Sequence, residues 1–355
     1  MPTVSSEELK QLAESILRAA GANEWETQVV SSHLLDANLA GHDSHGVMRV
    51  LQYVAEVEAG HIAPGSELQT LGDWPTGAVL DARGMFGQVA CHDAMQQAID
   101  KSRTAGIAAV TIRGANHSGR LGAYAEMAAA AGVTGIVMAN GGGAGQWVAP
   151  FGGREPRLST NPIAIGTPSS GRFPFLMDIS TSVAPEGKVR HCLQNAEPVP
   201  EGWLVDNQGN PTTDPRELYA EPGGALLPFG GSSGHKGYGL GFMVDVFAGA
   251  LTAAGCPTTP RTDPGVRSGL FMLAIDIERY TPLDDFSQRV SDMAGYFKSS
   301  EPAAGFDEVL VPGELEYQQR LKRQQEGIPI PDSVWNDLDQ LLTRLSPSHH
   351  QETSK

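Results

Sequence analysis

Two helical ends enclose a middle region of short apolar strands, and this division constrains the fold more than any other feature of the chain. Leucine, isoleucine and valine recur every three to four residues over residues 5–20, 23–40 and 47–57, which predicts three helices. The first two begin with the residue spacing of a capping box. From residue 313 the chain turns polar and is again predicted to be helical.

The middle region alternates predicted strands with predicted helices. Strands are expected over residues 76–84, 107–113, 132–140, 173–180 and 270–277, and helices over 87–106 and 122–131. The apolar segment 237–255 is predicted to be a buried helix. We therefore expect an N-terminal helical part over residues 1–70, an α/β domain over 71–311 and a C-terminal helical part over 312–355.

Charge and cysteine content narrow the class of protein. The 355 residues include 25 Lys and Arg against 41 Asp and Glu, a formal net charge of −16, which argues against nucleic-acid binding. No run of 18 apolar residues predicts a membrane span, and the first ten residues lack a signal-peptide pattern. Three widely spaced cysteines form no disulfide framework, so we expect a cytoplasmic protein.

The segment GHDSHGVMR, Gly41 to Arg49, concentrates polar chemistry directly after a predicted helix. A histidine beside a hydroxyl, here His45 beside Ser44, can hold one tautomer and pass a proton near neutral pH. The guanidinium of Arg49 suits a carboxylate, so these groups suit reduction of a 2-oxo acid. An elaborate helix N-cap is the alternative. A metal at His42 and His45 is less well supported, because no third ligand is evident, and we expect no metal.

The loop GANHSGRLGAYAE, Gly114 to Glu126, joins a predicted strand to a predicted helix. Backbone amides at a helix N-terminus form an anion site, Arg120 adds positive charge, and Gly119 permits close approach. A pyrophosphate would suit this loop, and an ordinary glycine-rich loop with a surface His117 is the alternative. We find no GxGxxG fingerprint in the chain, so a dinucleotide would bind a fold other than the Rossmann fold.

Two more segments carry charge at the end of a strand or the start of a helix. In MDISTSVAPEGK, Asp178 follows an apolar strand and suits ribose hydroxyls, while Lys188 suits a phosphate or a substrate carboxylate. Turn chemistry explains this segment equally well. In GGSSGHKGYGLGF, His235 and Lys236 stand at the start of an apolar helix. A helix dipole disfavours cations there, unless an anion shares the site, and a flexible loop before a helix is the alternative.

Together these segments resemble the type-2 malate/L-lactate dehydrogenase family, whose members use NAD or NADP without a Rossmann fold. The motifs AGHDSHGVMR, NHSGRLGAYAE, LSTNPIAIGTP, MDISTSVAPEGK, GNPTTDP, GHKGYGLGF and VLVPGELE occur in the family's order across most of the chain. The resemblance is strongest to the hydroxycarboxylate dehydrogenase B type, through ANLAGHDSHG, FGQVACHDAM, VAPFGGRE and RQQEGIP.

The resemblance implies roles for individual residues. His45 would exchange the proton at the substrate carbonyl or hydroxyl, Ser44 would orient it, and Arg49 would hold the substrate carboxylate. His117 falls in the family's second histidine motif and is the alternative general base. Thr160 and Lys188 would contact substrate, and Lys188 argues for a hydroxy acid over an imine. The residues expected to line the cofactor are Ser118, Gly119, Arg120, Leu121, Asp178, Ile179, Ser180, His235, Lys236, Gly237, Pro312, Gly313 and Glu314.

The resemblance also implies a fold, a reaction and a partner. The fold would be mixed α/β, with a predominantly antiparallel sheet in the cofactor domain and a helical domain built by both chain ends. The reaction would transfer a hydride between NAD or NADP, with NAD favoured, and a 2-hydroxy acid/2-oxo acid pair of the malate, lactate or aryl-lactate type. The family works as a homodimer or larger assembly. A non-catalytic cofactor-binding protein on this scaffold, and a reductase of another small oxo or imino acid, are the alternatives.

Overall fold

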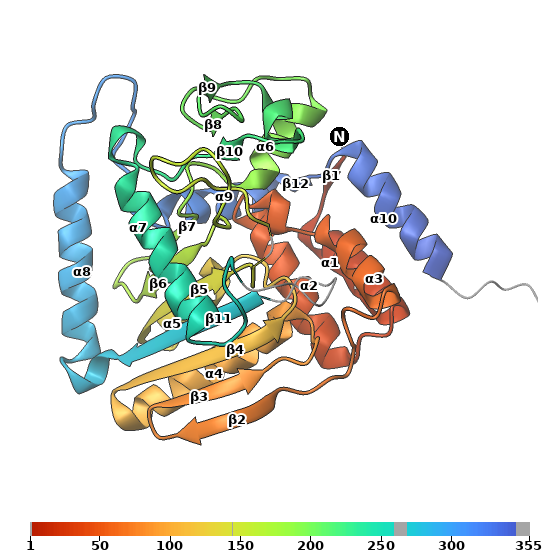
Figure 1. Ribbon diagram of the computed structural model, residues 1–355. Coiled ribbons are helices and arrows are strands. Elements are labelled where there is room, and N and C mark those ends of the chain that lie inside the picture. The colour runs from red at the N-terminus through yellow and green to blue at the C-terminus, as the bar shows by residue number, and fades with distance from the viewer. Residues whose placement is uncertain (1, 144, 259–267, 346–355) are drawn as a thin grey trace, which may run out of the picture.

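A seven-stranded sheet forms the centre of the computed structural model, which describes residues 2–143, 145–258 and 268–345 (Figure 1). The strands lie in the order β2-β3-β4-β11-β5-β6-β7, and only the β3–β4 pair is parallel. Their bounds are β2 Gln69–Trp74, β3 Gly77–Asp81, β4 Ile107–Ala115, β5 Val133–Asn140, β6 Ile163–Thr167, β7 Phe175–Ile179 and β11 Ser268–Asp276. The predicted mixed α/β class, with a mostly antiparallel sheet, is confirmed.

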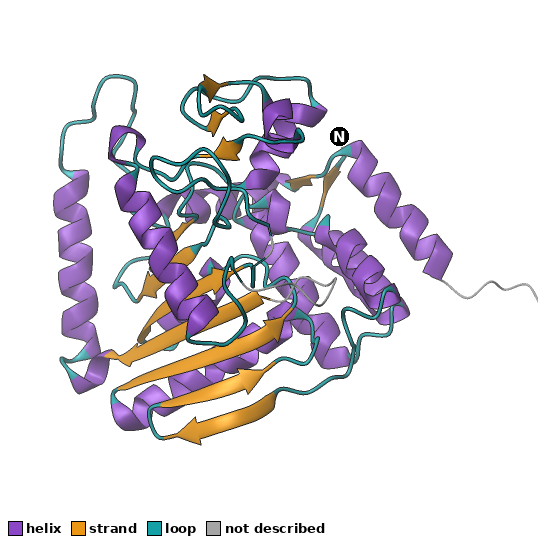
Figure 2. Cartoon of the chain, in the orientation of Figure 1, coloured by secondary structure: helices purple, strands orange, loops and turns teal. Residues whose placement is uncertain are grey.

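Helices cover both faces of this sheet (Figure 2). Helices α4 (Gly87–Ala105) and α5 (Gly122–Ala130) pack on one face, and α7 (His235–Val244) lies on the other. Alternate residues of β5 belong to two separate cores, Val137 to the first and Met138 to the second, because side chains alternate along a strand. No helix in the described ranges is long and apolar enough to cross a membrane.

The two chain ends pack together beside the sheet. Helices α1 (Ser6–Ala19), α2 (Glu24–Leu39) and α3 (Arg49–Glu58) come from the N-terminal end, and α9 (Glu314–Glu326) and α10 (Asp332–Leu345) from the C-terminal end. Helix α10 contacts α1 and α3, α9 contacts α2, and the short strands β1 (Thr3–Val4) and β12 (Ile328–Pro329) pair. One apolar core is continuous from these helices into the sheet, so the proposed boundaries at 70 and 311 stay a prediction.

Several elements escaped the sequence patterns. A small sheet of β8 (Leu204–Val205), β9 (Pro211–Thr212) and β10 (Ala225–Leu226) lies near α6 (Glu186–Gln194), and α8 (Leu283–Lys298) stands at one edge of the molecule (Figure 1). Two-residue strands are too short to show a hydrophobic period. Helix α8 exposes Met293, Tyr296 and Phe297, so its apolar residues do not mark a single buried face.

The prediction of one buried helix over residues 237–255 is wrong. Helix α7 continues into a π-helical segment, Asp245–Ala250, and only one side of this unit packs on the sheet through Val244 and Ala248. Phe242 is 54% exposed and Leu251 is 58% exposed. The segment is apolar all round, which is typical of a fully buried helix, but this chain covers only one of its faces.

Candidate active site

The segment between α2 and α3 forms a tight turn, residues 41–47, hereafter the His45 turn. Its centre is a single 3-10 turn, Asp43–His45, in which Ser44 Oγ lies 3.0 Å from Nδ1 of His45. Asn38 at the end of α2 accepts a hydrogen bond from the amide of Val47 at 2.8 Å. A Cβ atom at Gly46 would lie 2.2 Å from Oδ1 of Asn38, so only glycine fits this close approach. The predicted pairing of Ser44 with His45 is present.

Arg49 begins α3 and faces the same turn. Its Nε donates to the carbonyl of Ser44 at 2.6 Å and its Nη1 to Oε1 of Gln52 at 2.7 Å. Its Nη2 has no hydrogen-bond partner among the described residues. Burial lowers the pKa of Arg49. The ordinary pKa of an arginine is so high that the guanidinium still stays charged at neutral pH. Gly187 of α6 lies against Ser44, so α6 borders the site.

The structure brings the two candidate histidines together. The rings of His45 and His117 stack with centroids 5.5 Å apart and planes 22° from parallel. The hydroxyl of Tyr53 lies 2.7 Å from Nδ1 of His117 and accepts a hydrogen bond from Nε2 of Gln88 at 2.5 Å. Because the hydroxyl already accepts from Gln88, its own hydrogen is available for Nδ1 of His117. This pattern favours a neutral His117 ring with its hydrogen on Nε2.

Burial keeps both rings neutral. It lowers the pKa of His45 to about 3, and the positive charge of Arg49 adds to the effect. Burial and Arg49 also hold the pKa of His117 well below its usual range. Burial raises the pKa of Tyr53, which keeps the phenol protonated as a donor to His117.

The loop before α5 is held from behind by α2. Its Gly119 has a φ of +72°, and a Cβ atom there would lie 2.2 Å from Nε2 of His33. The amide of Arg120 donates to the same nitrogen at 2.9 Å. Burial lowers the pKa of His33 to about 3, so the ring stays neutral and accepts this bond. Ser118 and Leu121 are also buried.

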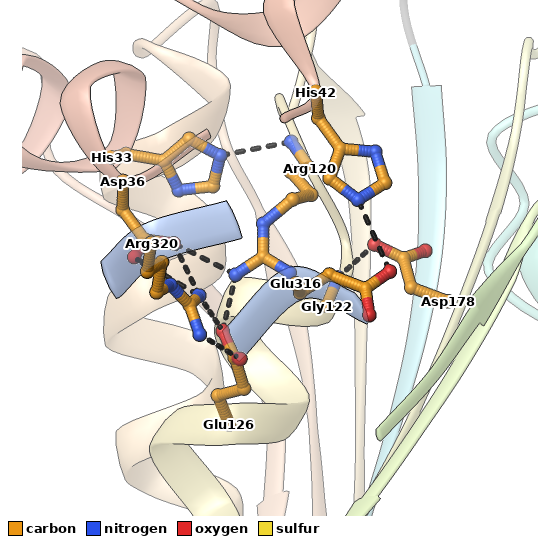
Figure 3. Close-up of polar contacts among 9 residues, drawn as sticks. All are labelled: His33, Asp36, His42, Arg120, Gly122, Glu126, Asp178, Glu316 and Arg320. Carbon is orange, nitrogen blue, oxygen red and sulfur yellow. Dashed lines mark hydrogen bonds and ion pairs between the residues drawn. The ribbon is translucent and has the colours of Figure 1, made fainter. Parts of the chain in front are cut away.

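The side chain of Arg120 points inward. From the sequence we expected its positive charge to face a pyrophosphate. It is 1% exposed and forms ion pairs with Asp36 of α2, at 2.7 Å, and with Glu126 of α5 (Figure 3). Arg320 of α9 pairs with the same two carboxylates at 3.0 and 2.8 Å. The guanidinium therefore neutralises these two carboxylates through Nη2, while its Nε and Nη1 are buried and have no hydrogen-bond partner among the described residues.

Asp178, at the end of β7, lies beside this cluster (Figure 3). Its Oδ2 accepts a hydrogen bond from the amide of Gly122 at 2.8 Å, and burial raises the pKa of its carboxyl group. Ile179 is 37% exposed, and Ser180 donates its hydroxyl to the carbonyl of Ser182 at 3.0 Å. Three neighbouring residues of the predicted cofactor set therefore lie at one strand end.

The remaining predicted residues lie at four other positions. His235 and Lys236 are exposed at the start of α7, and Gly237 is packed so closely that a Cβ atom would lie 2.4 Å from the carbonyl of Phe229. Gly313, with a φ of +87°, packs against β7, and the carbonyl of Pro312 accepts a hydrogen bond from the amide of Leu176. Glu314 forms an ion pair with Lys298 at 2.6 Å. Thr160 accepts two hydrogen bonds from Thr181 through its carbonyl, and Lys188 is exposed on α6. No recorded contact among the described residues joins Thr160 or Lys188 to Ser44, His45 or Arg49.

Several residues of the site were missed by sequence reasoning. Tyr53 follows Arg49 by four residues and so lies on the same face of α3, which is a signal that the helical pattern contained. Gln88 and Asn38 gave no signal, because a buried amide in a helix looks like an ordinary polar residue. His42 forms an ion pair with Glu316 at 3.5 Å, and the described residues contain no group of three or more metal-ligating side chains.

Comparison with known proteins assigns a family to this arrangement. The family described as malate/L-lactate dehydrogenase matches residues 4–339. The chain belongs to this family. It is 37% identical to the malate dehydrogenase of Pyrococcus abyssi, across 96% of this chain and 94% of that protein. It is 36% identical to hydroxycarboxylate dehydrogenase B of Escherichia coli, across 92% and 90% respectively.

A solved structure confirms the fold of this family. The malate dehydrogenase of Entamoeba histolytica superposes with a TM-score of 0.93 at 30% identity, and the match covers 98% of this chain and 99% of that one. The resemblance inferred from seven ordered motifs is therefore confirmed over the whole length of the family.

We predict that neither His45 nor His117 in this family member gains a proton between pH 8 and about pH 5. Burial and the Arg49 cation disfavour the charged ring, so both pKa values lie below that window. Nitrogen–hydrogen correlation spectra of protein labelled with ¹⁵N-histidine measure this directly, with His45→Gln and His117→Gln used for assignment. A ring that titrates above pH 6 contradicts the prediction.

Proposed function

We propose that the protein catalyses the NAD(P)-dependent interconversion of a 2-hydroxy acid and a 2-oxo acid. The observation that carries the proposal is the assembly of two stacked neutral histidines, a serine and a buried arginine at one site. These groups supply a proton carrier and a carboxylate clamp within a few ångströms of each other. The names of the relatives support a hydroxy acid as substrate.

Each group has a distinct task in this reaction. Arg49 holds the substrate carboxylate, since two of its donors are fixed to the protein and Nη2 has no hydrogen-bond partner among the described residues. His45, oriented by Ser44, takes the hydroxyl proton during oxidation and returns it during reduction. His117 donates from Nε2 to the reacting oxygen, because Tyr53 occupies its Nδ1. A bound carboxylate also offsets the positive charge of Arg49, which favours protonation of His45 in the complex with the 2-oxo acid.

The residues present fit a nicotinamide dinucleotide. His235 and Lys236 are exposed cations at the start of α7, where they suit a phosphate, and the backbone of Ser118–Leu121 enters α5. When bound, the cofactor supplies hydride transfer to and from the substrate carbon. Asp178, near the end of β7, and Pro312–Glu314, beside its start, border the same edge strand and would hold the rest of the molecule.

We favour NAD over NADP. Asp178 and Glu316 are carboxylates on the same side of the Arg120 cluster (Figure 3). A carboxylate at a strand end, such as Asp178, accepts hydrogen bonds from ribose hydroxyls and repels a 2′-phosphate. The spacing of the three cysteines supports a reducing cytoplasm as the place where this reaction occurs.

The activity is tested by following NADH and NADPH absorbance with a panel of 2-oxo acids. We predict that His45→Ala lowers turnover about 100- to 10,000-fold while NADH affinity is nearly unchanged, because the ring acts only as a proton carrier. Arg49→Lys should instead raise the Michaelis constant strongly, because a point charge cannot reproduce a planar fork. If His45→Ala keeps near-normal turnover and His117→Ala abolishes it, the proton carrier is His117.

We predict that Lys236→Ala weakens NADH binding about tenfold or more, the scale of one lost charge-assisted contact. Lys10→Ala is the matched control, because Lys10 is a surface lysine on α1 that pairs with Glu14 at 3.9 Å. Fluorescence titration measures both dissociation constants. Equal affinities for the two variants would remove Lys236 from the cofactor site.

We further propose a homodimer or larger assembly that covers the exposed face of α7. Multi-angle light scattering should give at least twice the chain mass of 37.6 kDa. Leu251→Glu should shift the protein toward monomer, because it puts a charge on an apolar face that is 58% exposed in the single chain. Leu71→Glu on the edge strand β2 is the control, since Leu71 is 42% exposed far from α7. A stable, active monomer of the parent chain at micromolar concentration would contradict the assembly.

A further inference from the structure

We propose that helix α9 positions the Ser44–His45 pair, and that Arg323 is the positioning residue that acts through Asp43. The proposal rests on the proposed function, because it concerns the histidine that would carry the proton. It also gives a role to the C-terminal RQQEGIP motif, which begins at Arg323 and to which the proposed reaction assigns no task.

The contact between Arg323 and Asp43 is a bidentate ion pair. Nη1 of Arg323 lies 2.6 Å from Oδ1 of Asp43, and Nη2 lies 2.9 Å from Oδ2. The Arg323 side chain is only 11% exposed and that of Asp43 is 47% exposed, so solvent reaches the carboxylate but not most of the guanidinium. Asn38 donates to the same Oδ1 at 2.6 Å. Asp43 directly precedes Ser44. The ion pair therefore holds the backbone next to Ser44, the residue that orients the proposed proton carrier His45.

One face of α9 touches the His45 turn at three points. Glu316, Gln319 and Arg323 follow each other at intervals of three and four residues, which places them on one side of a helix. Glu316 pairs with His42 (Figure 3), and Gln319 packs so closely on Gly41 that a Cβ atom there would lie 3.1 Å from its side chain. The helix therefore contacts three consecutive residues, 41 to 43, that lead into Ser44.

Arg320, on the same helix, fixes α9 itself. Its guanidinium binds Asp36 of α2 and Glu126 of α5, the two carboxylates that also bind Arg120 (Figure 3). Against the cost of burial, Glu126 and Asp36 raise the pKa of Arg320, so this anchor stays charged. These ion pairs fix α9 relative to the sheet. The contacts of α9 with residues 41–43 then fix the His45 turn.

The turn needs such support because its own bonds are few. Within it the backbone forms only the hydrogen bonds from His45 to His42, at 2.9 Å, and from Gly46 to Asp43, at 3.0 Å. A single 3-10 turn has weak internal geometry, so it is easily displaced. A displacement of about 1 Å at a reacting group can cost about 100-fold in rate.

The experiment compares Arg323→Gln, Asp43→Asn and the double variant with the parent chain. Each single change should lower turnover about 10- to 100-fold and leave the NADH dissociation constant within about twofold. The double variant should lose no more than the worse single variant, because both changes break one interaction. Arg323→Lys, which keeps the charge but not the fork, should recover part of the turnover.

Arg344→Gln is the matched control. Arg344 also joins a C-terminal helix to an N-terminal one, through Glu58 at 2.6 Å, but both side chains are about half exposed. Its turnover and melting temperature should equal those of the parent. The asparagine variant at Asp43 keeps the side-chain shape, so it tests the proposal even where Arg323→Gln does not fold.

Hydrogen–deuterium exchange of residues 41–47 supplies a readout that needs no activity. Exchange should rise there in Arg323→Gln and Asp43→Asn and stay at the parent level in Arg344→Gln. A folded Arg323→Gln with turnover within about twofold of the parent, or with unchanged exchange at 41–47, overturns the proposal. If the parent reduces no 2-oxo acid, the proposed function fails, and the exchange data still decide whether Arg323 holds the turn.

Discussion

A partly buried group of two arginines and two carboxylates holds together parts of the chain that are far apart in sequence. Arg120, Arg320, Asp36 and Glu126 come from a loop and three helices and meet beside the sheet. Charges removed from water are costly unless they are matched and hydrogen-bonded, so the loss of any one of the four leaves an unbalanced charge among the other three. This mutual dependence fixes α2, α5 and α9 at one relative position, and the His45 turn follows α2 and contacts α9.

The site then combines rigid backbone with neutral side chains. Glycines stand where the chain passes closest to a polar side chain, at Gly46 beside Asn38 and at Gly119 beside His33. Burial keeps His33, His45 and His117 uncharged, so each ring can accept a hydrogen bond at one nitrogen. The same low polarity strengthens the electrostatic attraction between Arg49 and a substrate anion, because little solvent competes for the anion.

Sequence patterns predicted many of the helices and strands and the local motifs, because these depend on neighbours in the chain. The capping box at Asn23 and Glu26, the left-handed end of α4 at Gly106 and the pairing of Ser44 with His45 are all of this kind. The stack of His45 on His117 joins residues that are 72 positions apart, and no local period encodes it. Arg120 shows the limit most clearly: its motif suggested a ligand cation, but its partners Asp36 and Glu126 are identified only by the fold. The apolar segment 237–255 was misjudged for the opposite reason, since its composition is that of a buried helix and a single chain leaves one face uncovered.

The pairing of Asp43 with Arg323 has a consequence for synthesis of the chain. The two residues are separated by 280 positions, and the ribosome makes the His45 turn long before it makes α9. Until Arg323 emerges, the turn is held by Asn38, by Arg49 and by backbone hydrogen bonds, and the carboxylate of Asp43 has no arginine partner. A nascent chain can therefore fold its sheet with both histidines present and still lack an ordered proton carrier. The proposed proton carrier is fully ordered only after α9 has docked on the turn.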